Sequence, residues 1–173
     1  MTSLALKPCP ELPCTPLLRW LKVNFDGSVH PNNCAGLGCI IRNHAGELLA
    51  ASGAGIPSRS VNMTELRSAL HGILLAKSYL NNVFSGIVEG DSAYACDVLN
   101  RILSGIYDGG LETKLAHCFK DFPKLAISQI DRNANSAADY VASMAVSSRF
   151  WWERGMPLTR ALSFILSKDY FPM

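Results

Sequence analysis

Residues 21–28 read Leu-Lys-Val-Asn-Phe-Asp-Gly-Ser, and this stretch organises the interpretation of the whole chain. Apolar and polar side chains alternate from Leu21 to Phe25, as they do in a half-buried β-strand. Asp26 follows at once, so a carboxylate stands at the C-terminal end of an apolar strand. In α/β sheets that edge is where ligand sites form. Asp26 is therefore the first candidate functional residue.

The flanking sequence predicts further strands and helices around this strand. Strands are expected at 37–42 and 47–55, joined by a turn at His44-Ala45-Gly46, and a helix follows at 62–80. A strand at 86–90, helices at 92–103 and 111–120, a strand at 124–130 and an alanine-rich helix at 135–146 complete the series. Three hairpin strands followed by two crossover strands predict an α/β fold, with a mixed five-stranded sheet and helices on both faces.

The chain of 173 residues divides into three predicted parts. Residues 1–19 form a Pro-rich N-terminal tail or linker, because prolines at this density oppose both helix and sheet. Residues 20–146 form the folded domain. Residues 147–173 form a C-terminal extension with a short docking helix at 158–167, although a membrane-surface helix is an alternative. Trp151 and Trp152 are interpreted as covering this helix, and a base-stacking platform is the other interpretation.

Composition excludes several classes of protein. Hydrophobic residues make up 49% of the chain and charged residues 17%, so a real core is expected and global disorder is excluded. No apolar run is long enough to span a membrane. The net charge is only +2, so any binding of nucleic acid must rest on a local site. The sequence shows no secretory signal, and we expect a cytoplasmic or nuclear protein with reduced thiols.

The six cysteines leave one alternative open. Cys9 and Cys14, like Cys34 and Cys39, have four residues between them, and two such pairs could hold zinc. The first pair falls in the Pro-rich tail, and the second would have to share a strand hairpin. We therefore favour small buried or tail residues over a zinc site.

Four carboxylates stand out from the other acids because apolar sequence surrounds them. Asp26 and Asp91 each end an apolar strand, Glu65 borders the apolar stripe of the first helix, and Asp139 lies among small residues in the last helix of the domain. A charge directed toward a core is costly unless it is paired or bound to metal. Oxygen ligands without histidine or cysteine favour Mg²⁺ or Mn²⁺. Two such ions about 4 Å apart would suit in-line phosphoryl transfer. Taken singly, a strand-end Asp is usually a turn former.

Two other motifs have weaker interpretations. Gly36-Leu37-Gly38 lacks the third glycine and the helix of a dinucleotide-binding fingerprint. Gly90-Asp91-Ser92 is similar to the nucleophile motif of one lipase family. That family needs an Asp-x-x-His near its end, and none of the four histidines has an aspartate three residues before it.

Four segments together resemble type 1 ribonuclease H. They are Asn24–Ser28 with Ala35–Asn43, Thr64–Leu70, Val88–Ser92, and Arg132–Asp139. The resemblance covers residues 20–146 and is strongest to the plant-type, retroelement-derived ribonuclease H-like domain. It implies a ribonuclease H-like fold and a Mg²⁺- or Mn²⁺-dependent endonuclease that cuts the RNA strand of RNA/DNA hybrids without sequence preference. The products would carry 5′-phosphate and 3′-hydroxyl ends.

The resemblance also assigns roles to individual residues. It implies that Asp26, Glu65, Asp91 and Asp139 are the catalytic, metal-binding carboxylates. Gly27 and Ser28 would approach the RNA 2′-hydroxyls, the groups that distinguish RNA from DNA. The substrate-binding residues implied in this way are Gly27, Ser28, Asn62, Ser92, Gln129 and Asn135.

Three departures from the family pattern lower the expected activity. Gln129 occupies the position where the family often has a histidine, and glutamine cannot titrate. Ala93 lacks a polar contact found in some members, and the sequence has no Lys/Arg cluster of three. We therefore expect slow turnover and weak, salt-sensitive binding of hybrid. A catalytically weak or inactive nucleic-acid-binding or interaction module is the alternative function, and a different phosphotransfer on the same fold is a third.

Overall fold

The computed structural model describes residues 20–78 and 85–169. The predicted N-terminal tail, with Cys9 and Cys14, lies outside the described residues. In chain order the elements are β1 (Trp20–Val29), β2 (Cys34–Asn43), β3 (Leu48–Pro57), α1 (Val61–Ser78), β4 (Ser85–Gly90), α2 (Ala93–Leu103), α3 (Gly110–Phe119), β5 (Lys124–Gln129), the 3₁₀ turn η2 (Arg132–Asn135), α4 (Ser136–Ala145), β6 (Phe150–Glu153) and α5 (Arg160–Asp169). The predicted elements of the domain are thus present, with shifts of a few residues at their ends.

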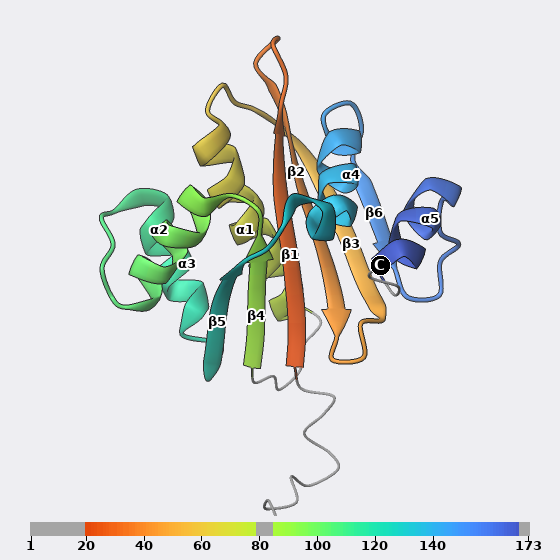
Figure 1. The fold of residues 1–173 in the computed structure, drawn as a ribbon. Helices are drawn as coiled ribbons and strands as arrows, with labels where there is room; N and C mark the ends of the chain where they lie inside the picture. The colour runs from red at the N-terminus through yellow and green to blue at the C-terminus, as the bar shows by residue number, and fades with distance from the viewer. Residues whose placement is uncertain (1–19, 79–84, 170–173) are drawn as a thin grey trace, which may run out of the picture.

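The sheet is mixed and has the strand order β5-β4-β1-β2-β3-β6 (Figure 1). β1, β2, β3 and β6 pair antiparallel, whereas β4 lies parallel to both β1 and β5. The architecture is therefore the mixed α/β sheet that the sequence predicted, and it agrees with the ribonuclease H-like fold that the resemblance implies. The prediction of five strands was wrong by one, because β6 adds to the edge at β3. Four residues are too few to show an alternation, and their pairing partner lies far away in the sequence.

Helices cover the two faces of the sheet and enclose two apolar clusters. The larger cluster packs α1, α2 and α3 on one face around Phe25, Ile41 and Ile73. The smaller cluster lies on the other face, where Ile40 and Ala51 meet α4 and α5. Figure 1 shows α1 behind the strands and α4 in front of them. The lower parts of β1, β4 and β5 carry no helix on the front face in this view.

Glycines in β2 let α4 approach the sheet closely. A Cβ atom on Gly38 would lie 2.4 Å from the backbone nitrogen of Ala142 and 2.5 Å from the carbonyl oxygen of Ala138. Any side chain at Gly38 would therefore push α4 away from the sheet. This close packing sets the position of Asp139, which lies in the first turn of α4.

The C-terminal extension contains a strand as well as the predicted helix. Trp152 in β6 is buried against Leu162 and Leu166 of α5, and its Nε1 donates to the Met156 carbonyl oxygen at 3.0 Å. The interpretation is thus confirmed for Trp152 and wrong for Trp151, which is exposed because neighbouring residues of a strand point to opposite faces. Among the described residues, no helix combines the length and the hydropathy that a membrane span requires.

Candidate metal centre

Three elements bring three carboxylates to one edge of the sheet. Asp26 lies in β1, and Asp91 directly follows β4, the parallel neighbour of β1. Because β1 and β4 run in the same direction, their C-terminal ends meet at the same edge of the sheet. Glu65 lies in the first half of α1, which packs across β1 and β2. The chain thereby gathers acids that are far apart in the sequence.

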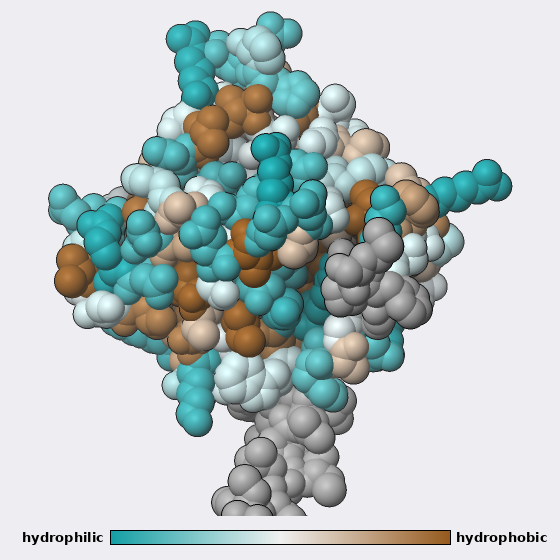
Figure 2. Space-filling view, viewed as in Figure 1, coloured by the Kyte–Doolittle hydropathy of each residue, from teal (hydrophilic) through white to brown (hydrophobic). Residues whose placement is uncertain are grey.

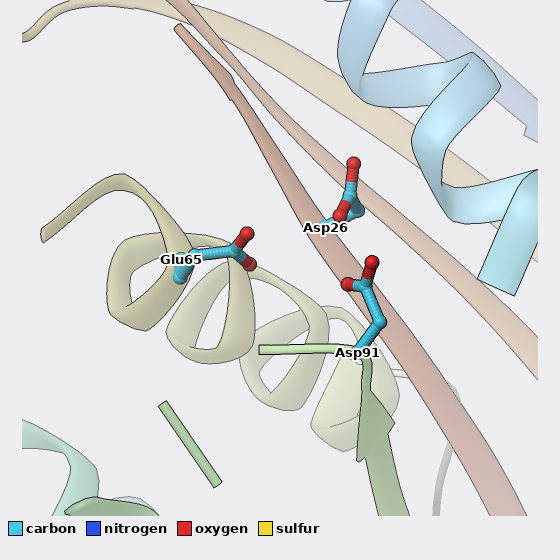
Figure 3. Close-up of side chains that lie close together, drawn as sticks. All are labelled: Asp26, Glu65 and Asp91. Carbon is cyan, nitrogen blue, oxygen red and sulfur yellow. The ribbon is translucent and has the colours of Figure 1, made fainter. Parts of the chain in front are cut away.

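The carboxyl groups of Asp26, Glu65 and Asp91 are turned toward a common space (Figure 3). One oxygen of each lies within 4.8 Å of the others. Asp26 and Glu65 are both 6% exposed, and Asp91 is half-buried. The arrangement concentrates negative charge where little water can screen it.

This crowding changes how the acids hold protons. Burial, together with the like charges of Glu65, Asp91 and Asp139, raises the pKa of Asp26 to about 9. Burial, followed by the charge of Asp91, raises the pKa of Glu65 to about 8. Without a cation, the centre therefore retains protons at neutral pH that ordinary carboxyl groups would release.

Glu65 shows how the chain orients one of these groups. The backbone N–H of Gly27 donates to the Glu65 carboxylate and acts to lower its pKa. A Cβ on Gly27 would lie 2.9 Å from Thr64 Cγ2 and 3.0 Å from the Glu65 nitrogen, so glycine is needed where β1 meets α1. Glu65 Oε2, however, is buried without a hydrogen-bond partner. An orphaned carboxylate oxygen of this kind calls for a ligand.

Asp139 contributes charge to the centre but not to its tightest set. Its negative charge raises the pKa of both Asp26 and Glu65, so it lies near enough to act on them from α4. Its carboxylate is not part of the group formed by Asp26, Glu65 and Asp91, whose oxygens lie within 4.8 Å of one another. The structure therefore brings all four predicted carboxylates to one region, with Asp139 at its margin.

Asn135 fixes the position of Asp91. Its Nδ2 donates to the Phe25 carbonyl oxygen at 2.8 Å and to Asp91 Oδ1 at 3.4 Å, which links β1, the end of β4 and the start of α4. The side chain is 2% exposed, and its Oδ1 has no partner. Gln129, which is exposed, donates from Nε2 to the Asp91 backbone carbonyl at 3.3 Å.

The other predicted site residues surround the centre. Gly27 and Ser28 are half-buried in β1, and Asn62 is exposed in the first turn of α1. Ser92 is the N-cap of α2, where its hydroxyl accepts the N–H of Ala95 at 3.2 Å. This capping role gives the Gly90-Asp91-Ser92 motif a structural explanation without a nucleophile.

One residue near the centre was not singled out from the sequence. The positive charge of Arg132 in η2 acts to lower the pKa of Glu65, so the two side chains share one electrostatic environment. Arg132 belongs to the quoted Arg132–Asp139 motif, but no spacing rule relates it to Glu65, which precedes it by more than sixty residues. The zinc alternative finds no support here, because Cys39 is buried and Cys34 is exposed, and the one candidate metal cluster among the described residues is acidic.

The donor set fits a hard divalent cation. Its ligands are carboxylate oxygens, two of them on nearly buried groups, and Glu65 Oε2 lacks any partner from the protein. Mg²⁺ and Mn²⁺ prefer such oxygen ligands. A cation would also replace the protons that mutual repulsion holds on Asp26 and Glu65.

Comparison with known protein families identifies the family of this chain. The sequence profile of the reverse transcriptase-like family matches residues 24–145, more than half of the chain. The chain belongs to this family, and its fold is that of type 1 ribonuclease H. No curated protein matches the sequence significantly.

Solved structures of low sequence identity share this fold. Ribonuclease H1 from the archaeon Halobacterium salinarum NRC-1 is 19% identical with a TM-score of 0.63, covering 73% of this chain and 97% of its own. The N-terminal RNase H domain of a Mycobacterium tuberculosis protein is 21% identical with a TM-score of 0.63, covering 75% and 94%. LC11 ribonuclease H1, solved in complex with an RNA/DNA hybrid, is 23% identical with a TM-score of 0.61, covering 73% and 96%.

Proposed function

We propose that this chain is a divalent-metal-dependent endonuclease that cleaves the RNA strand of RNA/DNA hybrids. The observation that carries the proposal is the cluster of Asp26, Glu65 and Asp91, whose oxygens lie within 4.8 Å of one another at the sheet edge. The type 1 ribonuclease H fold supports the class of reaction. The hybrid bound to LC11 ribonuclease H1 supports the class of substrate.

In this proposal Asp26, Glu65 and Asp91 hold Mg²⁺ or Mn²⁺, and Asp139 adds negative charge from α4. Such ions, when bound, lower the pKa of water and stabilise a leaving oxygen. The chain's own residues keep the ligands in place, because Asn135 holds Asp91 and the Gly27 N–H holds Glu65. The half-buried Gly27 and Ser28 and the exposed Asn62 lie on the elements that carry Asp26 and Glu65, and we assign them to contacts with the RNA strand.

The test is a cleavage assay on a hybrid with labelled RNA. We expect Mg²⁺-dependent cleavage of the RNA strand, no cleavage of a DNA duplex, and loss of activity on adding EDTA. Asp26→Asn should abolish cleavage, while the control Asp97→Asn, an exposed aspartate of α2, should not. Absence of cleavage at high protein concentration, with wild type and Asp26→Asn behaving alike, would end the proposal.

One observation favours a second candidate, a nucleic-acid-binding module with little or no turnover. Gln129 reaches the Asp91 backbone but cannot carry a proton at neutral pH, unlike the histidine that the family often has there. Such a module would bind hybrid in EDTA and leave it intact when Mg²⁺ is added. Multiple turnover would exclude it. The plant-type, retroelement-derived origin and the cytoplasmic or nuclear location remain predictions.

A further inference from the structure

A groove adjoins the carboxylate centre on the same face of the sheet. Asn24 and Glu89 precede Asp26 and Asp91 by two residues, so their side chains emerge on the same side as these acids. Asn24 Nδ2 donates to Glu89 Oε2 at 3.2 Å, and Lys22 Nζ lies 3.2 Å from Glu89 Oε1. This network forms the boundary between the carboxylates and the groove.

The groove extends from this boundary over the lower part of the sheet, with a volume of about 1340 Å³. Its apolar lining comes from Trp20 and Ile87 on the strands, from Ile130 after β5 and from Ala134 in η2. In Figure 2, hydrophobic and hydrophilic residues lie side by side over this part of the molecule. The volume exceeds the ~300–1,000 Å³ of ordinary small-molecule sites, so an extended ligand fits better than a compact one.

The polar lining of the groove is cationic and rich in amides. Its charged side chains are Lys22, Arg42, Lys168, Glu89 and Asp131; the Lys22–Glu89 pair is neutral as a whole, which leaves two cations against one carboxylate. Side-chain amides of Asn24, Asn43 and Asn133 and the imidazole of His44 also line it. Cations and amides suit phosphates and base edges, whereas the core of a protein interface is depleted of charged residues.

Trp20 gives the groove a surface for stacking. It is 40% exposed at the start of β1 and lines the groove. An exposed aromatic ring beside cationic side chains is the combination by which proteins hold single strands, because every base has a face that can stack.

We infer that the groove binds a single-stranded nucleic-acid extension of the hybrid, with bases against Trp20 and Ile87 and phosphates toward the cationic side chains. The inference rests on the proposed function, because the single-stranded extension is taken to belong to an RNA/DNA hybrid substrate. Binding itself requires neither metal nor cleavage. The substrate would thus be a hybrid that continues into a single strand, held at a second site next to the cleavage centre.

The experiment measures the Kd of fluorescent hybrids in EDTA, so that no cleavage intervenes. Blunt hybrids are compared with hybrids that carry a single-stranded RNA extension at the 5′ or the 3′ end. We expect the extension at one end to tighten binding by at least about fivefold, the effect of one stacked base. Trp20→Ala should remove this gain, and Trp20→Phe should restore most of it.

Trp151→Ala is the matched control for Trp20→Ala. Trp151 is 44% exposed, but its register through Ser52 and Cys39 to Phe25 places it on the opposite face of the sheet. We expect this variant to keep the full gain from the extension. Lys168→Gln should reduce the salt dependence of extension binding, and Lys114→Gln, an exposed lysine of α3, should not.

Equal Kd values for blunt and extended hybrids would overturn the inference, as would equal losses in Trp20→Ala and Trp151→Ala. If Trp20→Ala instead changes the oligomeric state or the proteolysis of residues 1–19, the groove holds protein and the inference is wrong. Failure of the proposed function has a different signature. In that case the extension still tightens binding in EDTA, but no RNA is cut when Mg²⁺ is added.

Discussion

Replacing Asp26 by asparagine should stabilise the protein when no metal is present. The carboxylates of Asp26, Glu65 and Asp91 repel one another in a poorly hydrated place, and the substitution would remove two of the three repelling pairs. It keeps the shape of the side chain and removes only its charge. A site that is built to bind a cation is expected to cost stability in this way.

The geometry sets the size of the effect. At 4.8 Å and an effective dielectric constant of about 20, each ionised pair is repelled by about 3.5 kcal/mol. Keeping a proton on Asp26 at pH 7 instead costs about 4 kcal/mol, because its ordinary pKa is 3.8. Protonating Asp26 costs less free energy than leaving two such pairs ionised. The stabilisation by Asp26→Asn therefore cannot exceed about 4 kcal/mol. Water near the half-buried Asp91 screens the repulsion and makes the stabilisation smaller than this limit. We expect Asp26→Asn to raise the free energy of unfolding by about 2–3 kcal/mol.

The pH dependence has a definite sign. In the folded, metal-free protein the pKa of Asp26 is raised to about 9, so the folded state holds a proton that the unfolded state releases above pH 3.8. Stability of the wild type should therefore fall as pH rises from about 4 to about 9, and then level off. The stability of Asp26→Asn should fall less steeply over the same pH range.

Urea unfolding in EDTA across this pH range provides the assay. Asp97→Asn is the control because it removes an exposed carboxylate of the same type from α2. If wild-type stability does not decline with pH, or if Asp26→Asn is no more stable than Asp97→Asn, the carboxylates do not repel one another as argued and the reasoning is refuted.

Three further predictions concern other parts of the structure. Glu65→Gln should abolish the rise in Tm that Mg²⁺ gives the wild type, and an unchanged rise would place the metal elsewhere. Gly38→Ala should lower the free energy of unfolding by about 1–3 kcal/mol in urea melts, because its Cβ would lie 2.4 Å from the Ala142 nitrogen; a neutral effect would contradict the packing of α4. Gln129→His should raise kcat roughly tenfold at neutral pH with little change in KM, and an unchanged kcat would show that no proton carrier is needed at this position.

Much of the fold could be predicted because its signals are local. The alternation from Leu21 to Phe25 and the helical spacing after Val61 each depend on neighbouring residues, and the structure has β1 and α1 at these places. β6 gave no such signal, since four residues gain their strand structure only by pairing with β3.

The candidate site shows the same limit. Asp26 and Asp91 could be predicted to share an edge, because each follows an apolar strand segment, although β1 continues past Asp26 to Val29. The separation of Asp139 from the other three acids depends instead on how closely α4 approaches Gly38. The charge of Arg132 near Glu65 and the hydrogen bond from Asn135 to Asp91 are likewise consequences of tertiary packing. Residue types indicated the chemistry, and three-dimensional contacts determined which groups act together.

Anomalous diffraction from crystals grown with Mn²⁺ would locate the cation itself. Our interpretation predicts a peak bound by oxygens of Asp26, Glu65 and Asp91, and its loss in crystals of Asp26→Asn. A map without Mn²⁺ at these three side chains, from wild-type crystals saturated with the ion, would contradict it.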